Sequence, residues 1–413
     1  MTPRQHEQLD AWIDAHFDAE VRFLQELVRV PTDTPPGDNA PHAERTAGLL
    51  AEMGWVAERH GVPVATVRER GLRSITNLIV RRRHGPGPTI ALNAHGDVVP
   101  PGEGWTHPPY DGVIEDGRLY GRGAAVSKSD FATYVFAVRA LESLGAPLAG
   151  TIELHFTYDE ELGGECGPAW LLGQRLTRPD YALCASFAYQ IINAHNGCLQ
   201  LEVTVHGRTA HAAIPHTGID ALQGANAILT ALYAENKAYR VRRSQVPGID
   251  HPCINVGRIE GGSHTNVVPG KVVMKLDRRM IPEEDPVTVE TQLRHVIATA
   301  ATAAPGVTVD VRRLLLARAL RPLPGAQPLI EALQRHGTAV IGVDVPTSGA
   351  PLYTDARLYG EAGIPAVLYG AGPRTVLESN AKRADEHLVL EDLRKATKVV
   401  SRALGDLLDG SRA

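Results

Sequence analysis

The sequence predicts an α/β domain with a second, α+β domain inserted into it. Its 413 residues are too many for one ordinary hydrophobic core, so two domains are expected. Short β-branched or apolar runs alternate with helical stretches as far as about residue 190, and this alternation resumes near Gln327. The pattern between them is that of a compact α+β unit. We therefore expect a mixed sheet flanked by helices in 1–190 and 317–413, with an inserted domain in 191–316.

The first part begins with apolar residues at helical spacing. They predict one or two amphipathic helices that end before Pro31, because proline and glycine follow. Further along, strands are expected at 77–80, 89–92 and 151–156, and helices at 43–53 and 131–144.

The inserted part changes to alternating strands with two helices. Strands are expected at 199–205, 253–259, 272–277 and 307–311, and helices at 220–234 and 286–303. The first pattern then returns with a helix at 327–337, a strand at 366–369 and a helix at 390–407.

Composition indicates a globular protein and excludes some partners. Hydrophobic residues make up 43% and charged residues 22% of the chain. With a formal charge of -5 and no basic tract, nucleic acid is not an expected partner. The first thirty residues carry charges throughout, which favours neither a signal peptide nor a membrane span. We expect a cytoplasmic protein, no membrane partner and four reduced cysteines.

A histidine and an aspartate directly follow one of the predicted strands. His95 and Asp97 come after the apolar run at 89–92. A histidine at a strand end with a carboxylate two residues later suits a metal ligand whose ring is oriented by the acid. A solvated loop histidine is the other interpretation of this short pattern.

Three acidic residues follow the predicted strand at 151–156. They are Asp159, Glu160 and Glu161. Adjacent carboxylates repel one another, so this placement makes sense when one binds a cation and another takes up a proton. An exposed acidic turn is the alternative.

Both motifs belong to a series of matches that spans nearly the whole chain. The other matching segments are 105–110, 117–124, 205–211, 261–262, 266–269, 277–279, 354–356 and 385–386. The series resembles the zinc-dependent aminoacylase, acetylornithine deacetylase, succinyl-diaminopimelate desuccinylase and carboxypeptidase G peptidase family. This resemblance implies a zinc-peptidase-like catalytic domain with an inserted lid domain that commonly mediates homodimers. It also implies a small-molecule substrate, such as an N-acyl amino acid or a peptide.

In this family two zinc ions share a bridging aspartate, and a glutamate activates the bridging water. The resemblance places His95 at a histidine ligand and Asp97 at the carboxylate that orients its ring. It places Glu160 at the general base and Glu161 at a carboxylate ligand. All four positions are intact.

Three other ligand positions carry side chains that do not suit zinc. Val126 stands at the bridging aspartate, Ser186 at an acidic ligand and Lys382 at the last histidine. A valine offers no ligand atom, a hydroxyl is a poor ligand and an ammonium repels the ion. Since a catalytic zinc generally needs three protein ligands, we expect no dinuclear centre and no other cofactor, unless an unusual zinc site is rebuilt.

The three changes agree with one another in charge. Val126 and Ser186 remove two negative charges, and Lys382 adds a positive one near Glu160 and Glu161. We hypothesise that Lys382 replaces metal charge through an ion pair with Glu161 or Glu160. Alternatively, Lys382 is a surface lysine. His155, within an apolar strand, is expected to be a hydrogen-bonded core residue and not a replacement ligand.

The resemblance also implies residues that act on the substrate. His211 matches a histidine that stabilises the oxyanion in the site of the other subunit. Asn266 matches a lid residue that contacts substrate, and Arg279 the position that binds a substrate carboxylate. Gly372 lies in a loop that approaches the substrate backbone, and Ser186 is assigned to the same substrate-binding set. A helix-capping role for His211 and an internal salt bridge for Arg279 are the structural alternatives.

Three functions follow as hypotheses. The first is a metal-independent enzyme in which Glu160 is the acid/base, His95 a second proton carrier, and Lys382 and His211 stabilise negative charge. Its reaction is amide hydrolysis or another proton transfer, such as an isomerisation or elimination. The second is zinc-dependent amide hydrolysis through an altered site. The third is a non-catalytic protein that binds a small molecule.

Overall fold

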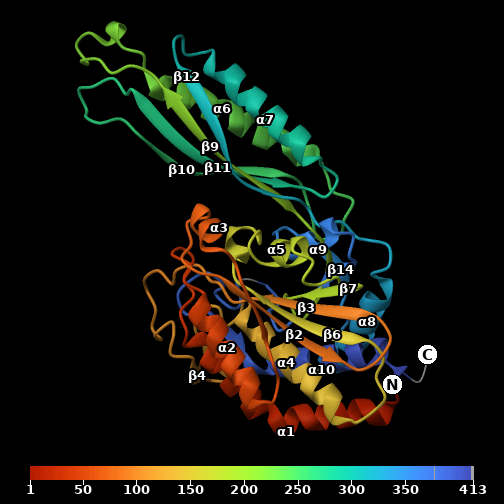
Figure 1. Cartoon of the computed structure of the whole chain (residues 1–413). Coiled ribbons are helices and arrows are strands. Elements are labelled where there is room, and N and C mark those ends of the chain that lie inside the picture. The colour runs from red at the N-terminus through yellow and green to blue at the C-terminus, as the bar shows by residue number, and fades with distance from the viewer. Residues whose placement is uncertain (376, 411–413) are drawn as a thin grey trace. The chain divides into compact units, whose positions relative to one another are not determined.

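The computed structural model describes residues 1–375 and 377–410, which form two compact units (Figure 1). Unit 1 comprises Met1–Asn193, Pro322–Ser348 and Thr354–Ala413, and unit 2 comprises Ala194–Arg321 and Gly349–Tyr353. The expected boundaries differ in detail, because 317–321 and 349–353 belong to unit 2 and 191–193 to unit 1. Unit 2 holds the later segment partly through a hydrogen bond from the Gly349 amide to the Pro247 carbonyl, 2.7 Å long.

Unit 1 begins with one long helix, α1 (Pro3–Val28), where one or two were expected. Thr2 caps it, since its hydroxyl accepts from the Gln5 amide and the Gln5 side chain bonds back to the Thr2 backbone. Leu9 and Ile13 lie on its buried face, so the helix is held by packing as well as by its cap.

The central sheet of unit 1 has eight strands in the order β1-β2-β6-β3-β7-β14-β8-β13. It is mixed: β3 pairs in parallel with β6 and β7, whereas β2 runs antiparallel to β6. Its strands are β1 (Glu58–Gly61), β2 (Thr76–Arg83), β3 (Thr89–His95), β6 (Thr151–Thr157), β7 (Tyr181–Cys184), β8 (Ile191–His195), β13 (Thr347–Ala350) and β14 (Ala366–Leu368). This confirms the predicted mixed sheet.

Helices lie on both faces of this sheet. Figure 1 shows α4 and α10 on one side, and α5 and α9 on the other. The helices after α1 are α2 (Ala40–Glu52), α3 (Val64–Glu69), α4 (Lys128–Ser143), α5 (Pro168–Gly173), α8 (Gln327–Ile341), α9 (Ala356–Glu361) and α10 (Leu390–Leu407). The core between α4 and the sheet includes Phe131 stacked on Phe156, with ring centroids 4.0 Å apart. A small sheet joins β4 (Val113–Glu115), β5 (Arg118–Tyr120) and β15 (His387–Val389).

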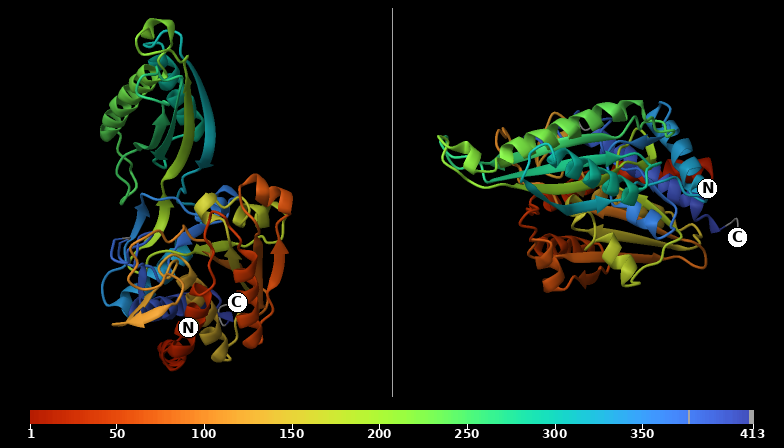
Figure 2. Two further views of the ribbon diagram at one scale, coloured as in Figure 1. Left: turned by 90° about the vertical axis from the view of Figure 1, so that its left-hand side faces the viewer. Right: turned by 90° about the horizontal axis from the view of Figure 1, so that it is seen from above.

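Unit 2 is an α+β unit with its own core. Its antiparallel strands follow the order β10-β11-β9-β12, and two helices pack against one face (Figure 2). The elements are β9 (Gly197–His206), β10 (Cys253–Gly261), β11 (Lys271–Met280), β12 (Thr308–Ala317), α6 (Ala221–Ala238) and α7 (Pro286–Ala301). Burial alternates along β9 and β11, as expected for a sheet covered on one face.

The structure also bears on the expected reduced cysteines and on the expectation that the chain does not span a membrane. The four cysteines are free thiols, and Cys166, Cys184 and Cys198 are buried. Among the described residues, no helix combines the length and the apolar character needed to cross a membrane.

Candidate functional site

The parallel pairing of β3 with β6 brings the two polar motifs together. His95, the last residue of β3, pairs with Thr157, the last residue of β6. The residues that follow, Asp97 and Asp159–Glu161, therefore emerge at the same edge of the sheet. Carboxyl ends of neighbouring parallel strands are where α/β proteins commonly place their functional groups.

Asp97 organises this edge. Its carboxylate is fully buried, and Oδ1 lies 3.3 Å from Nδ1 of His95. The same carboxylate accepts hydrogen bonds from the backbone amides of Glu160 (3.3 Å) and Glu161 (3.0 Å). Asp97 therefore orients the His95 ring, as the resemblance implied, and also fixes the turn η1 (Glu160–Leu162).

His95 and Glu160 face each other as two proton-transfer groups. Nε2 of His95 lies 3.8 Å from Oε2 of Glu160. The His95 side chain is only 9% exposed and the Glu160 side chain only 13%. Burial alone would lower the pKa of His95, but the charges of Glu160, Asp97 and Glu161 raise it to about 10. Burial raises the pKa of Glu160, against the opposing effect of the His95 charge. A cationic imidazole thus lies next to a carboxyl group whose proton affinity is increased.

Lys382 forms an ion pair with Glu161. Its Nζ lies 2.6 Å from Oε2 of Glu161, with 56% of the lysine side chain and 9% of the glutamate side chain exposed. Burial opposes the charge of Lys382, but Glu161 and Glu160 raise its pKa above the ordinary lysine value. This contact confirms one of the two pairings predicted for Lys382. Its catalytic role stays a prediction.

Glu386 holds the segment of Lys382 against the segment of Val126. Its carboxylate accepts hydrogen bonds from the amides of Gly123 (3.0 Å), Ala125 (3.3 Å) and Lys382 (3.3 Å). Arg122 neutralises it through a buried ion pair. Lys382 therefore belongs to the same site as Val126, which speaks against the alternative of an unrelated surface lysine.

The side chains at this site do not fit the family's pair of zinc ions. Val126 has no donor atom, and the ammonium of Lys382 is bonded to the carboxylate of Glu161, which would be a ligand. Among the described residues, the group of side chains placed closely enough to hold a metal ion lies elsewhere. It consists of His6, His336 and Asp406, whose ligand atoms lie within 4.8 Å of one another. No chemistry through a zinc pair follows from these residues.

Asp355 is a further member of the site to which the sequence analysis assigned no role. It is 4% exposed, and its Oδ2 has no hydrogen-bond partner among the described residues. Burial, and then the charges of Glu160 and Asp159, raise its pKa well above the ordinary range. The signal was present, since Asp355 lies in one of the matching segments. Its approach to Glu160 depends on packing and not on a local pattern.

Ser186 and Gly372 are neighbours in the structure. The Gly372 amide donates to the Ser186 carbonyl over 2.8 Å, and the Ala188 amide donates to the Gly372 carbonyl over 2.9 Å. A Cβ on residue 372 would lie 2.8 Å from the Ser186 carbonyl oxygen, so this close approach requires glycine. The two residues assigned to substrate binding are therefore brought together, although their role stays a prediction.

The other residues assigned to substrate binding by the resemblance lie in unit 2. His211 is exposed, and its Nδ1 accepts from the Ala213 amide over 3.1 Å. The Asn266 carbonyl accepts from the Ala212 amide over 2.9 Å, so these two residues share one loop region. Arg279 donates from Nε and Nη2 to Asp277, over 2.7 and 3.2 Å, which is the internal salt bridge considered as its alternative.

His155 is a core residue, as expected. It is fully buried, with Nδ1 2.8 Å from the Tyr359 hydroxyl and Nε2 3.0 Å from Glu153. Both ring nitrogens have partners, so His155 is not a replacement ligand for the site.

Known proteins resemble this chain over most of its length. The family model described as peptidase family M20/M25/M40 matches residues 91–406. A succinyl-diaminopimelate desuccinylase of Methylobacterium radiotolerans is 28% identical, covering 95% of this chain and 98% of the relative. An acetylornithine deacetylase of Myxococcus xanthus is 29% identical, covering 94% and 97%.

A solved structure shares the fold. The M20 family metallo-carboxypeptidase of Sulfolobus solfataricus has a TM-score of 0.77 and 18% identity, covering 93% of this chain and 98% of its own. At this identity the likeness establishes the fold alone.

Proposed function

Since the chain belongs to peptidase family M20/M25/M40, we propose that it hydrolyses the amide bond of a small N-acyl amino acid or dipeptide without the family's zinc pair. The observation that carries this proposal is the 2.6 Å ion pair between Lys382 and Glu161, formed beside the segment of Val126. A fixed ammonium occupies the place where the resemblance puts a histidine ligand. The desuccinylase and deacetylase names of the relatives support the substrate class.

Glu160 acts as the general base and then as the acid. It takes a proton from water as the water oxygen attacks the amide carbonyl, and it returns the proton to the leaving amine. A raised pKa suits both steps, because the group holds and releases the proton near neutral pH. His95 supports Glu160 as a neighbouring cation and second proton carrier.

Lys382 stabilises the negative charge that develops on the carbonyl oxygen. Its ammonium has three N–H donors, of which the hydrogen bond to Glu161 uses one. Its half-exposed side chain leaves the others available to a substrate. A positioned cation of this kind acts at the oxyanion, where electrostatic stabilisation is typically strongest.

Zinc-dependent hydrolysis is the second candidate. The intact His95, Asp97, Glu160 and Glu161 favour it, together with the relative described as a metallo-carboxypeptidase.

Several further expectations remain predictions that rest on the resemblance or on composition. They are the roles of His211, Asn266 and Arg279, a homodimer formed through unit 2 and a cytoplasmic location.

The two candidates separate in an activity screen with chelators. The chain is incubated with N-succinyl amino acids, N-acetyl amino acids and dipeptides, and products are measured by mass spectrometry. We expect hydrolysis that survives a zinc chelator. Glu160→Gln should lower kcat at least about 100-fold and Lys382→Met about 100-fold or more. Lys398→Met, which removes a lysine on α10 that pairs with Asp14 on α1, should leave turnover unchanged.

Other outcomes would contradict the proposal. Loss of wild-type activity on chelation, with recovery on adding zinc, supports the second candidate. Binding of a substrate without any turnover, unaffected by Glu160→Gln, supports the non-catalytic alternative.

A further inference from the structure

Three potential metal ligands from distant parts of the chain converge in unit 1. His6 lies on α1, His336 on α8 and Asp406 on α10, and their ligand atoms lie within 4.8 Å of one another. Nε2 of His6 is 3.5 Å from Oδ1 of Asp406, and Nε2 of His336 is 2.8 Å from Oδ2. The two rings meet edge to face, with centroids 4.7 Å apart. One ion between them could contact all three side chains.

His6 has a ring nitrogen, Nε2, that is available to bind a metal ion. Its Nε2 is buried and has no hydrogen-bond partner among the described residues. An imidazole nitrogen that has no hydrogen-bond partner among these residues and lies beside a carboxylate is available to bind a metal ion.

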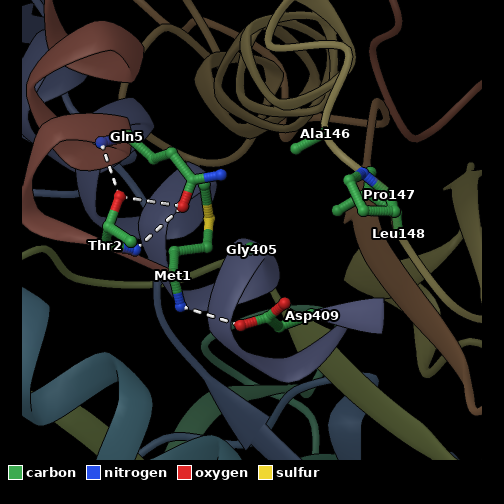
Figure 3. A pocket seen from close by; sticks show the side chains of 8 residues that line it. All are labelled: Met1, Thr2, Gln5, Ala146, Pro147, Leu148, Gly405 and Asp409. Carbon is green, nitrogen blue, oxygen red and sulfur yellow. Dashed lines mark hydrogen bonds and ion pairs between the residues drawn. The ribbon is translucent and has the colours of Figure 1, made fainter. Parts of the chain in front are cut away.

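Asp406 now has cationic partners that a metal ion would have to displace or share. The Met1 ammonium lies 2.8 Å from Oδ1 and also bonds to Asp409, 3.2 Å away (Figure 3). Arg335 lies 2.6 Å from Oδ2, but 60% of its side chain is exposed, so it can turn into water at little cost. A pocket of about 380 Å³ lined by Met1 and Asp409 opens beside these contacts and gives solvent a path to them.

From this convergence we propose that His6, His336 and Asp406 bind one divalent transition-metal ion of the zinc type, joining the first helix of unit 1 to its last. Two imidazole nitrogens and one carboxylate oxygen are the ligand set of many three-residue zinc sites, with water as the fourth ligand. The site shares no residue with the His95 region, and it does not rest on the proposed hydrolase activity. Zinc found in the purified protein would therefore be expected at His6 and not at Glu161.

Calorimetric titration with zinc chloride tests the site. An untagged chain is used, because a histidine tag binds zinc itself, and bound metal is first removed with a chelator. The wild-type chain should bind one zinc ion and melt at a higher temperature with it. His6→Gln should weaken binding at least about tenfold, as loss of even an outer-shell partner of a metal site commonly does.

A matched control separates a built site from any surface histidine. His84 has the same 16% side-chain exposure as His6 and lies 3.6 Å from Glu142, but no third ligand from the described residues accompanies it. His84→Gln should leave zinc binding unchanged, and so should His95→Gln. The proposal is wrong if the wild-type chain binds no zinc, if His6→Gln binds as tightly as wild type, or if His95→Gln abolishes binding.

A spectroscopic measurement covers the buried ligand, whose substitution could disturb folding. His336 is only 3% exposed, so His336→Gln is less suitable as a first variant. Cobalt(II) in place of zinc should give visible absorption in the wild-type chain, and this absorption should be lost in His6→Gln while its circular dichroism stays that of the folded protein. Equal cobalt spectra in both proteins would contradict the proposal.

Discussion

Lys382 changes its surroundings through the charge that it brings as well as through the ligand that it replaces. Its ammonium bonds to Glu161, and its charge acts to lower the pKa of Glu160, against the larger effect of burial. A dication in the same place would have to displace this contact and overcome charge repulsion. The valine and the lysine therefore act in the same direction, although only the lysine contributes a new interaction.

A second lysine makes a prediction about pH. Lys128 is fully buried, and its Nζ donates to the carbonyls of Leu27 (3.2 Å) and Val30 (2.9 Å). Burial lowers its pKa to about 7, although Asp33, Glu386 and Asp97 act in the opposite direction. Between about 7 and the ordinary value of about 10.4, the unfolded chain binds a proton that the folded chain lacks. Lys128 therefore makes the free energy of unfolding rise with pH, by at most about 1.4 kcal/mol per pH unit.

Urea unfolding at several pH values between 7 and about 10 tests this contribution. His95 acts with the opposite sign, because its raised pKa makes the folded chain bind the additional proton until about pH 10. The test therefore compares, at each pH, the free energy of unfolding of each variant with that of the wild-type chain. Relative to wild type, Lys128→Met should lose stability as the pH rises, whereas Lys398→Met should follow wild type. Parallel curves for wild type and Lys128→Met would mean that Lys128 stays charged in the folded state.

At the scale of elements, the register of two strands and one short turn build the site. Pairing of His95 with Thr157 sets the relative height of the two motifs, and a slip of one residue would turn the side chains to the other face. The turn after β6 then depends on Asp97, which bonds to the amides of Glu160 and Glu161. The position of Glu160 is thus determined by its backbone partners before any substrate is present.

Gly164, close after the turn that follows β6, leaves no room for a side chain. Gly164 has a φ of +73°, and a Cβ there would lie 2.1 Å from Oδ1 of Asp355. Gly71, with a φ of +76°, has open space around the same position. Both alanine variants should lose about 1 kcal/mol through backbone conformation. Gly164→Ala should lose more stability and also lower kcat, because Asp355 must move.

Thermal unfolding and steady-state kinetics on the two variants check this expectation. Circular dichroism shows whether each variant keeps its fold. If Gly164→Ala and Gly71→Ala have equal stability and equal kcat, the close packing of Asp355 against the turn does not matter for the site.

At the scale of the whole molecule, the chain contains two hydrophobic cores. Leu154 is fully buried in the core of unit 1, and Leu201 is fully buried in the core of unit 2. The chain enters and leaves unit 2 as a continuous insertion, Ala194–Arg321, to which Gly349–Tyr353 is added. Separate cores make separate unfolding steps the expectation, since two-state behaviour usually fails for multidomain proteins.

Differential scanning calorimetry should therefore resolve two transitions. Leu154→Ala should lower one transition temperature and Leu201→Ala the other, each at a cost of about 2 to 5 kcal/mol in its own unit. A single transition that both variants lower equally would show that the two units unfold as one cooperative body.

The sequence by itself determined the elements with strong periodicity. The helix predicted at 390–407 is α10 with the same bounds, and the strands expected at 199–205 and 272–277 lie within β9 and β11. These segments carry their pattern locally, because burial on one face repeats with the period of the helix or strand. Short strands such as β7 and β13 were missed, since four residues are too few to show a period and depend on neighbouring strands.

Residue identity also determined which ligand positions were altered, because Val126, Ser186 and Lys382 can be read without coordinates. Only the tertiary structure decided that Lys382 bonds to Glu161, 221 positions away in the chain. The same holds for the burial of Asp355 beside Glu160 and for the meeting of His6 with His336 and Asp406. Such contacts arise from the packing of distant segments, which no local pattern of side chains specifies.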